Sequence, residues 1–447
     1  MAATSHHLRP ILLLLLVLFL SQLAHVHSQT PTAPRPKPKA ILLPVRKNGA
    51  ALQYTTNVRQ RAPLVPVKLA VDLGAQMPWV NCEDGYISSS YTPVPCESKL
   101  CKLSGSGACH TACYSPPAPG CHNNTCSQNV YNNFIRTSTM GDIAVEAAVF
   151  RSTDGKNPGR SVSVPGGVVL TCGYTSMLEG LAKNTRGMVG LGRSPVSLPP
   201  VLSSAFGFPN KFAMCLSSSS SQGVVIFGDG PYFLQPSKEV SSFLMNTPLI
   251  LNPVSTAGAY FEGEPSTDYF INVTGIKFNG RAVPLNSTLL KISKEGSGGT
   301  KLSTVDPYML METSIYRAVT RAFLNWGKHL KRVRSVKPFE HCFDAKGIGS
   351  TRVGPAVPQI ELLLGGKGGG SWTIFGANSM VYVGKGEIMC LGLVDGGADA
   401  RTSIVIGGHQ LEDNLVQVDM VKKRLGFTSS LLLHQTTCAN FNFTVVV

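Results

Sequence analysis

The stretch VDLGAQMPWVNC, residues 71–82, carries a strand-like run into a turn that holds an acid and a glycine. A second passage has the same layout, with a strand-like run at 269–276 ahead of TKLSTV at 300–305. About a hundred residues after each passage comes an apolar-apolar-Gly segment, at 187–193 and at 404–408. This repeated order predicts an internal duplication with a seam near residues 231–240.

Length and composition favour two lobes built mainly from strands. The chain has 447 residues, which is long for one domain and sufficient for two. Short Val, Ile, Leu and Thr runs bounded by Gly, Pro, Asn or Ser predict a mostly β fold. Few helices are expected. The best candidate is 313–330, where apolar residues recur at helical spacing, and a short helix is expected at 410–416.

The N-terminus has the pattern of a secretory signal peptide over residues 1–28. Arg9 supplies the positive charge, residues 11–20 form an unbroken apolar run, and small residues follow at the exit. The apolar run is too short to cross a bilayer, so we expect a secreted chain without a membrane anchor. The Pro-rich residues 29–45 are expected to form an extended leader.

The even number of cysteines, combined with the signal peptide, predicts disulfides. Seven of the twelve fall within residues 82–126, which are therefore expected to be a stapled loop insert. The counts leave the pairing open. A zinc site among Cys109, His110 and their neighbours is disfavoured by irregular spacing and by the oxidising compartment. The cysteines are Cys82, Cys96, Cys101, Cys109, Cys113, Cys121, Cys126, Cys172, Cys215, Cys342, Cys390 and Cys438.

Four N-x-S/T sequons and a basic charge balance fit the same compartment. A net charge of +15 is compatible with binding to nucleic acid, but the sequence shows no basic helix and no aromatic-basic RNA-binding motif. An acidic wall polysaccharide or an acidic protein partner suits a secreted chain better, and general solubility remains an alternative. The predicted glycosylation sites are Asn123, Asn272, Asn286 and Asn442.

The stretch VDLGAQMPWVNC at 71–82 resembles the first active-site loop of pepsin-like aspartic proteases, in which Asp-Thr-Gly-Ser/Thr is followed by Trp-Val. Residues 187–199 resemble the apolar-apolar-Gly segment of the first lobe in plant members, and residues 404–427 resemble the closing segment of the second lobe. The resemblance implies a bilobal pepsin-like double β-barrel with a central cleft and few short helices. It places an N-terminal lobe at 46–235, with the insert at 82–126, and a C-terminal lobe at 236–447.

Within that fold, three stretches resemble a non-proteolytic plant branch. This branch contains the extracellular dermal glycoprotein, the xyloglucanase and xylanase inhibitors, and the basic seed globulins. The stretches are 82–126, GTKLSTVDPY at 299–308 and RTSIVIGGHQLEDN at 401–414. The resemblance implies a protein of the plant apoplast that inhibits microbial glycoside hydrolases in defence, with a xyloglucan-specific endoglucanase as the first target.

An aspartic protease needs two carboxylates that share one proton, and the second is missing from its expected position. Asp72 aligns with the first, whereas Ser303 stands where the second is expected. Asp306 is three residues further on, an odd offset that would point it to the opposite face of a strand. The tyrosine of the substrate-covering flap is not found in 133–150. We therefore expect a pseudoenzyme, with no cofactor and no metal.

Two arginines are candidates for the inhibitory contact, because loops of the matched group present such residues from the second lobe. Arg401 follows a glycine-rich turn, and Arg332 follows the expected helix. A guanidinium forms bidentate hydrogen bonds with a carboxylate. Glycoside hydrolases carry a pair of catalytic carboxylates about 5–9 Å apart, which such an arginine can bind. For either arginine, the alternative is a solvated surface charge.

Three other functions stay open. A basic seed globulin would store protein, an acid protease would cleave it, and a receptor-like binder would use the vestigial cleft. Three residues or segments have simpler structural explanations: Trp79 as a core residue, His409 as a structural hydrogen-bonding group, and the glycine-rich run 365–370 as a hairpin tip.

Overall fold

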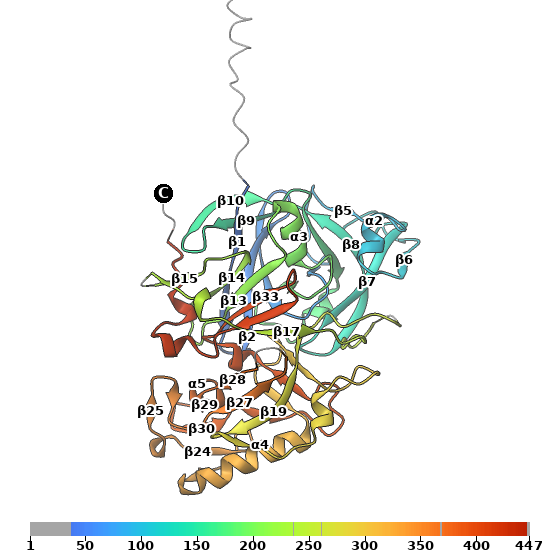
Figure 1. Ribbon diagram of the computed structural model, residues 1–447. Helices are drawn as coiled ribbons and strands as arrows, with labels where there is room; N and C mark the ends of the chain where they lie inside the picture. The colour runs from blue at the N-terminus through green and yellow to red at the C-terminus, as the bar shows by residue number, and fades with distance from the viewer. Residues whose placement is uncertain (1–36, 236, 261, 367–368, 445–447) are drawn as a thin grey trace, which may run out of the picture. The chain divides into compact units, whose positions relative to one another are not determined.

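The computed structural model describes residues 37–447 except 236, 261, 367–368 and 445–447. The expected signal peptide, 1–28, lies outside the described residues, as do residues 29–36 of the Pro-rich leader. Residues 38–447 form one compact unit (Figure 1). The boundaries 46–235 and 236–447 of the two lobes remain a prediction.

The first half is a set of paired strands around a buried apolar interior. The opening strand, β1, has a run of Ile, Leu and Val side chains that are buried on both faces. The strands are β1 (Ala40–Asn48), β2 (Gln53–Gln60), β3 (Val65–Asp72), β4 (Trp79–Asn81), β5 (Thr92–Pro93), β6 (Ala108–His110), β7 (Thr125–Asn132), β8 (Thr137–Glu146), β9 (Ala148–Thr153), β10 (Pro158–Ser163), β11 (Val168–Gly173), β12 (Gly187–Gly190), β13 (Lys211–Cys215) and β14 (Gln222–Gly228).

Strand β1 corrects the expected extent of the leader. It pairs with β14 from Ala40 onward, so residues 40–45 belong to the sheet and not to an extended leader. The apolar run that begins at Ile41 is the signal in the sequence for this strand, since buried strands read as continuous apolar runs.

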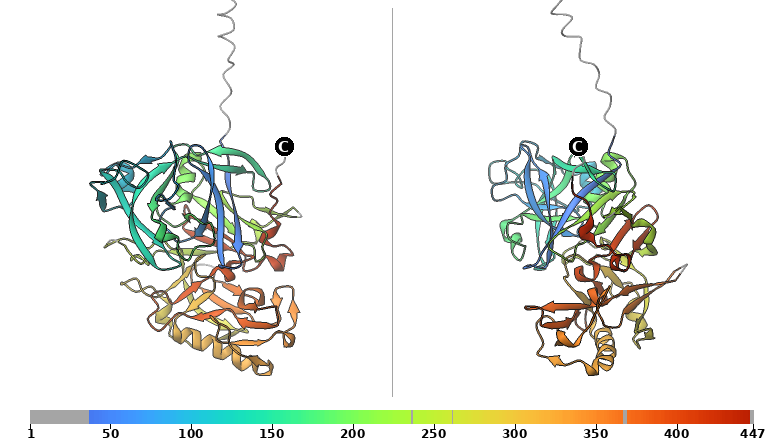
Figure 2. Two further views of the ribbon diagram at one scale, coloured as in Figure 1. Left: turned by 180° about the vertical axis from the view of Figure 1, so that it is seen from behind. Right: turned by 90° about the vertical axis from the view of Figure 1, so that its left-hand side faces the viewer.

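The second half combines short strands with a long helix on its outer side (Figures 1 and 2). Its strands are β15 (Phe233–Leu234), β16 (Lys238–Glu239), β17 (Met245–Ile250), β18 (Phe270–Ile271), β19 (Val273–Phe278), β20 (Arg281–Ala282), β21 (Thr300–Leu302), β22 (Met309–Met311), β23 (Arg332–Val333), β24 (Cys342–Asp344), β25 (Ser350–Thr351), β26 (Gly354–Pro355), β27 (Ile360–Leu364), β28 (Ser371–Ile374), β29 (Met380–Val383), β30 (Ile388–Leu391), β31 (Leu393–Asp395), β32 (Ile404–Ile406), β33 (Leu415–Asp419) and β34 (Arg424–Phe427).

Helices are few and mostly short, as the sequence predicts. The expected helix at 313–330 is α4 followed by one 3₁₀ turn, η4, and the one at 410–416 is α6, which ends before β33. The α-helices are α2 (Lys99–Leu103), α3 (Leu198–Phe206), α4 (Thr313–Trp326), α5 (Gly376–Ser379) and α6 (Gly408–Leu411). The 3₁₀ helices are η1 (Thr175–Leu178), η2 (Ser241–Phe243), η3 (Ser287–Leu290), η4 (Gly327–His329), η5 (Ala345–Gly347), η6 (Leu431–His434) and η7 (Cys438–Asn440). No helix among the described residues is long and apolar enough to span a membrane.

The two repeated passages adopt matching arrangements. In the first, β3 runs parallel to β12 with Asp72 opposite Gly190, and in the second, β21 runs parallel to β32. The glycines of the apolar-apolar-Gly segments allow the close approach of the neighbouring loop. A Cβ on Gly190 would lie 2.6 Å from the carbonyl carbon of Met77, and one on Gly407 would lie 2.3 Å from the carbonyl oxygen of Tyr308.

All twelve cysteines form disulfides, which confirms that prediction and supplies the pairing that the sequence left open. The stapled insert also contains helix α2 and strand β6, so it is more regular than a loop. Because the cysteines are paired, none is available to bind zinc. The bonds are Cys82–Cys172, Cys96–Cys109, Cys101–Cys126, Cys113–Cys121, Cys215–Cys438 and Cys342–Cys390.

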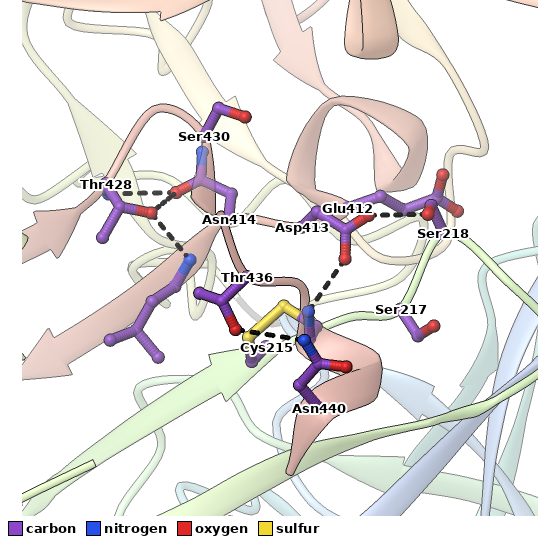
Figure 3. The surroundings of a disulfide bond; sticks show 12 residues. Cys215, Ser217, Ser218, Glu412, Asp413, Asn414, Thr428, Ser430, Thr436 and Asn440 are labelled. Carbon is purple, nitrogen blue, oxygen red and sulfur yellow. Dashed lines mark hydrogen bonds between the residues drawn. A yellow bond between two sulfur atoms is a disulfide. The ribbon is translucent and has the colours of Figure 1, made fainter. Parts of the chain in front are cut away.

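The C-terminal segment is fastened to the first half of the chain. Strand β33 pairs with β13 along its whole length, and Cys438 is bonded to Cys215 at the end of β13 (Figure 3). Asp413 reinforces this junction, since its carboxylate accepts hydrogen bonds from Ser218 Oγ at 2.6 Å and from the backbone N–H of Cys438 at 2.9 Å. Segments from both halves therefore share one sheet and one covalent link.

Candidate functional site: the central cleft

A cleft of about 480 Å³ is lined by residues from both halves of the chain. Asp72 and Ser303, the two expected positions of the vestigial catalytic pair, both line it, and so does Arg401. The structure therefore brings these three residues to one place, although they are far apart in sequence.

Asp72 ends strand β3 and is almost completely buried. Its Oδ1 accepts a hydrogen bond from the backbone N–H of Gly74 at 2.9 Å, and its Oδ2 accepts one from the side chain of Asn133, in the turn between β7 and β8. Burial raises the pKa of Asp72 to about 6, against the effect of these two hydrogen bonds and with a further contribution from the nearby Asp268.

Ser303 follows strand β21, and its hydroxyl forms hydrogen bonds with the backbone of the turn that comes next. Its Oγ accepts hydrogen bonds from the N–H groups of Val305 at 3.2 Å and Asp306 at 3.0 Å, which shape the turn after the strand. The next residue, Thr304, joins the two passages. Its Oγ1 donates to the carbonyl of Val71 at 2.8 Å and accepts from the N–H of Leu73 at 3.0 Å.

A second carboxylate near Asp72 was not found from the sequence. Asp268 and Asp72 flank Gly74, where an added Cβ would lie 1.9 Å from Asp268 Oδ1 and 3.7 Å from Asp72 Oδ1. Asp268 is engaged elsewhere: its Oδ2 pairs with Lys301 Nζ at 2.8 Å and accepts hydrogen bonds from Thr256 and Ser266.

Lys301 brings a cation into the same cleft. Burial disfavours its charged ammonium, but the ion pair with Asp268 outweighs that effect and raises its pKa. Lys301 could have been selected from the sequence, because it stands only two residues before Ser303. Asp268 gave no comparable signal, since it lies just before the short strand β18.

One expectation about the cleft was wrong. Asp306 was expected to point away from it but is one of the lining residues, because β21 ends at Leu302 and the alternation of a strand no longer applies. Residues 133–150 contain no tyrosine, but Tyr131 in strand β7, two residues ahead of them, lines the cleft.

The two candidate arginines occupy different surroundings. The Nη2 of Arg401 donates to the carbonyl of Ser255 and to Tyr260 Oη at 3.3 Å, and its guanidinium lies 5.2 Å from the centre of the Tyr260 ring. Arg332 is exposed in strand β23 and is not among the residues that line the cleft. The structure thus places Arg401 at the cleft and Arg332 away from it.

The remaining expected residues fall in varied settings. Trp79 is buried in the core as expected, although its Nε1 has no hydrogen-bond partner among the described residues. Both ring nitrogens of His409 are engaged, with Glu412 at 3.3 Å and with the carbonyl of Met380 at 3.0 Å, which fits the structural role. Of the sequon asparagines, Asn123 and Asn286 are exposed, whereas Asn272 and Asn442 are half-buried.

Comparison with known proteins identifies the family. A model described as xylanase inhibitor N-terminal matches residues 54–229, and one described as xylanase inhibitor C-terminal matches residues 268–429. The chain belongs to the xylanase-inhibitor family. The protein named probable aspartic proteinase GIP2, from Nicotiana benthamiana, is 53% identical over 91% of this chain and 93% of its own length.

Other members of the xylanase-inhibitor family carry different names. Basic 7S globulin from Glycine max is 35% identical over 90% of this chain and 92% of its own length. A crystal structure of a protein named edgp superposes with a TM-score of 0.89 at 50% identity, and covers 92% of this chain and all of that one. These matches confirm the expected plant branch of the pepsin-like fold.

No group of three or more His, Cys, Asp or Glu side chains that could hold a metal ion occurs among the described residues. What the cleft offers is a set of charged and polar side chains fixed by internal hydrogen bonds. Such an arrangement can recognise a partner by charge and hydrogen bonding at its rim.

Proposed function

We propose that this chain is a secreted, catalytically inactive family member that binds and inhibits microbial glycoside hydrolases that degrade plant cell walls. A xyloglucan-specific endoglucanase is the first target to test. Membership of the xylanase-inhibitor family supports a glycoside hydrolase as the partner. The observation that carries the proposal is the position of Arg401 at the cleft, held in one orientation by Tyr260 and Ser255.

The surroundings of Arg401 favour a preorganised contact. Its carbonyl accepts a hydrogen bond from Gly298 at 2.8 Å, which fixes the backbone of the loop, while the ring of Tyr260 supports the guanidinium. Only Nη2 is engaged within the described chain, so Nη1 and Nε remain for a partner. Limiting the motion of such a side chain before binding lowers the entropic cost of association.

The lack of proteolytic activity is part of the proposal. It is supported by the hydrogen bonds and ion pairs that the cleft residues already form. Ser303 has no acidic group to share a proton with Asp72 and is occupied by its own turn. Asp268 is close to Asp72, but its carboxylate is held in an ion pair with Lys301 and accepts hydrogen bonds from Thr256 and Ser266. One Asp alone lacks the acid and base that peptide hydrolysis requires.

Secretion to the apoplast is supported by six disulfides, because such bonds persist in oxidising compartments. The proposal includes an acidic wall polysaccharide as a second partner, supported by the net charge of +15. We propose no nucleic-acid partner and no membrane anchor.

The test is an inhibition assay on purified xyloglucanase, cellulase and xylanase of fungal and oomycete origin. Arg401→Ala is expected to weaken inhibition of the responsive enzyme by about 2 kcal/mol or more, since a buried Arg anchor is a typical hot spot. Arg352→Ala, which removes an exposed arginine elsewhere, serves as the matched control. Arg332→Ala is expected to have the smaller effect, because Arg332 lies outside the cleft lining.

Two results would overturn the proposal. Failure of the wild-type protein to inhibit any of these enzymes would exclude the inhibitor function, and high abundance in seed protein bodies would then favour a storage globulin. Unchanged inhibition by Arg401→Ala would remove that residue from the interface.

The acid protease is the second candidate, because Asp268 does supply a carboxylate near Asp72. Incubation with denatured haemoglobin at about pH 3, where a carboxyl pair shares its proton, distinguishes the two functions. Cleavage that is blocked by a peptide mimicking the transition state would establish the protease. Intact haemoglobin is the result expected here.

A further inference from the structure

One segment of the second half contains many basic residues and no acidic ones. Residues 313–337, which span α4, η4 and β23, contain seven Lys or Arg and no Asp or Glu. All seven are exposed, and together they are called the basic face. They are Arg317, Arg321, Lys328, Lys331, Arg332, Arg334 and Lys337.

Secondary structure arranges these cations along one line, so the chain does contain a basic helical stripe, contrary to the expectation from the sequence. Arg317, Arg321 and Lys328 are separated by four and then seven residues, which places them on the same stripe of α4 and its 3₁₀ extension. Ile315, Val319 and Phe323 are buried on the other side of the helix, against the core. The stripe covers about 16 Å along the helix axis, and the chain continues directly from it to the remaining cations in and around β23.

Almost none of this charge is neutralised within the described chain. The single ion pair is that of Lys331 with Asp344, at 3.5 Å on an exposed side chain. Three further acids contact the segment and pair with none of the seven cations, since Glu312 accepts a hydrogen bond from Ser314, Glu340 from Tyr316 and Asp395 from Thr313. Like charges four residues apart on a helix repel each other, so Arg317 and Arg321 cost the helix stability unless an anion binds them.

The composition of the basic face argues against a protein partner. Protein interfaces rely on buried aromatic or aliphatic anchors. Among the described residues, the large exposed hydrophobic side chains all lie outside 313–337. An extended row of cations without an apolar anchor suits a linear polymer that carries regularly spaced carboxylates, which Arg binds by bidentate hydrogen bonds.

We propose that the basic face is a binding site for an acidic polysaccharide, a chain of uronic acid units. None of its residues lines the central cleft, and α4 lies at the outer end of the second half (Figures 1 and 2). The inference rests on the proposed polysaccharide partner and not on hydrolase inhibition. A protein bound to the wall through this face keeps Arg401 free for an enzyme.

The test compares binding of full-length protein to sodium polygalacturonate and to its methyl-esterified, uncharged form. Wild type is expected to bind the charged polymer alone, with an affinity that falls as salt increases. The variant R317Q/R321Q/K328Q is expected to lose about tenfold or more in affinity, since it removes three of the seven cations that attract the anionic polymer. The matched control is K99Q/K102Q/K183Q, which removes three exposed cations from the first half.

Inhibition of a xyloglucanase on a soluble neutral substrate is measured with the same variants and is expected to be unchanged. This readout separates failure of the polysaccharide site from failure of the proposed function. Equal binding by the two triple variants, equal binding of the two polymers, or no binding by wild type would each overturn the proposal. Loss of enzyme inhibition by R317Q/R321Q/K328Q, without loss of polymer binding, would reassign the face to a protein.

Discussion

Asp72 shows how burial and hydrogen bonding compete at one residue. The carboxyl is removed from water, which favours its neutral form, while Asn133 and the N–H of Gly74 favour the charged form. The sequence was sufficient to select Asp72, because a strand that ends in Asp-x-Gly marks the cleft. It was not sufficient to select Asn133, which reaches Asp72 from the turn between β7 and β8, or Asp268, which reaches it through the packing of the two halves.

We predict that Asp72 makes stability fall with rising pH. Its folded pKa of about 6 is above the unfolded value of 3.8, so its contribution is full below about pH 4 and is lost as the pH rises through 6. Asp72→Asn removes this dependence, a difference of about 2 to 3 kcal/mol between pH 4 and pH 7. Urea unfolding across this range, with the exposed Glu262→Gln as control, measures it. Parallel pH profiles for wild type and Asp72→Asn would contradict the assignment.

Helix α4 shows which features of a helix can be predicted from the spacing of its apolar residues and which cannot. The spacing of Ile315, Val319 and Phe323 predicted the helix and its buried side. Its end was placed too late, because the last turn tightens to a 3₁₀ turn from Gly327. The short helix expected at 410–416 gives way to β33 at Leu415, since pairing with β13 outweighs the local preference there.

The packing of α4 leads to a stability prediction. The ring of Phe323 contacts those of Phe278, Trp326 and Phe343, and the side chain is almost fully buried. Phe323→Ala is expected to destabilise the protein by about 3 kcal/mol or more, through lost contacts and the remaining cavity. Arg321→Ala on the exposed side should change stability by less than about 0.5 kcal/mol. Equal denaturation midpoints for the two variants would show that α4 is not anchored by this ring.

At the scale of the molecule, the two halves depend on each other. The resemblance predicted the bilobal fold, and the six disulfides followed from the even number of cysteines, but no count could select their partners. Among the contacts far apart in sequence that join the halves are Cys215–Cys438 and those of Glu412, which binds Tyr54 at 2.7 Å and Lys47 at 2.6 Å. Neither has a local pattern that could have indicated it.

Removal of the long-range disulfide is expected to cost more than removal of a local one. Cys215 and Cys438 are separated by 223 residues, and Cys113 and Cys121 by eight. Because a longer closed loop restricts the unfolded chain more, C215S/C438S should lose about 2 to 3 kcal/mol more stability than C113S/C121S. Guanidinium unfolding of both double variants measures the difference. A larger loss in C113S/C121S would contradict this expectation.

The bond between Cys215 and Cys438 also decides how the molecule would respond to a proteolytic cut. Any single scission between these two cysteines leaves both fragments covalently attached, and strand β33 still seated beside β13. A cleaved molecule would therefore migrate as one species without reductant and separate into two only when the disulfide is reduced.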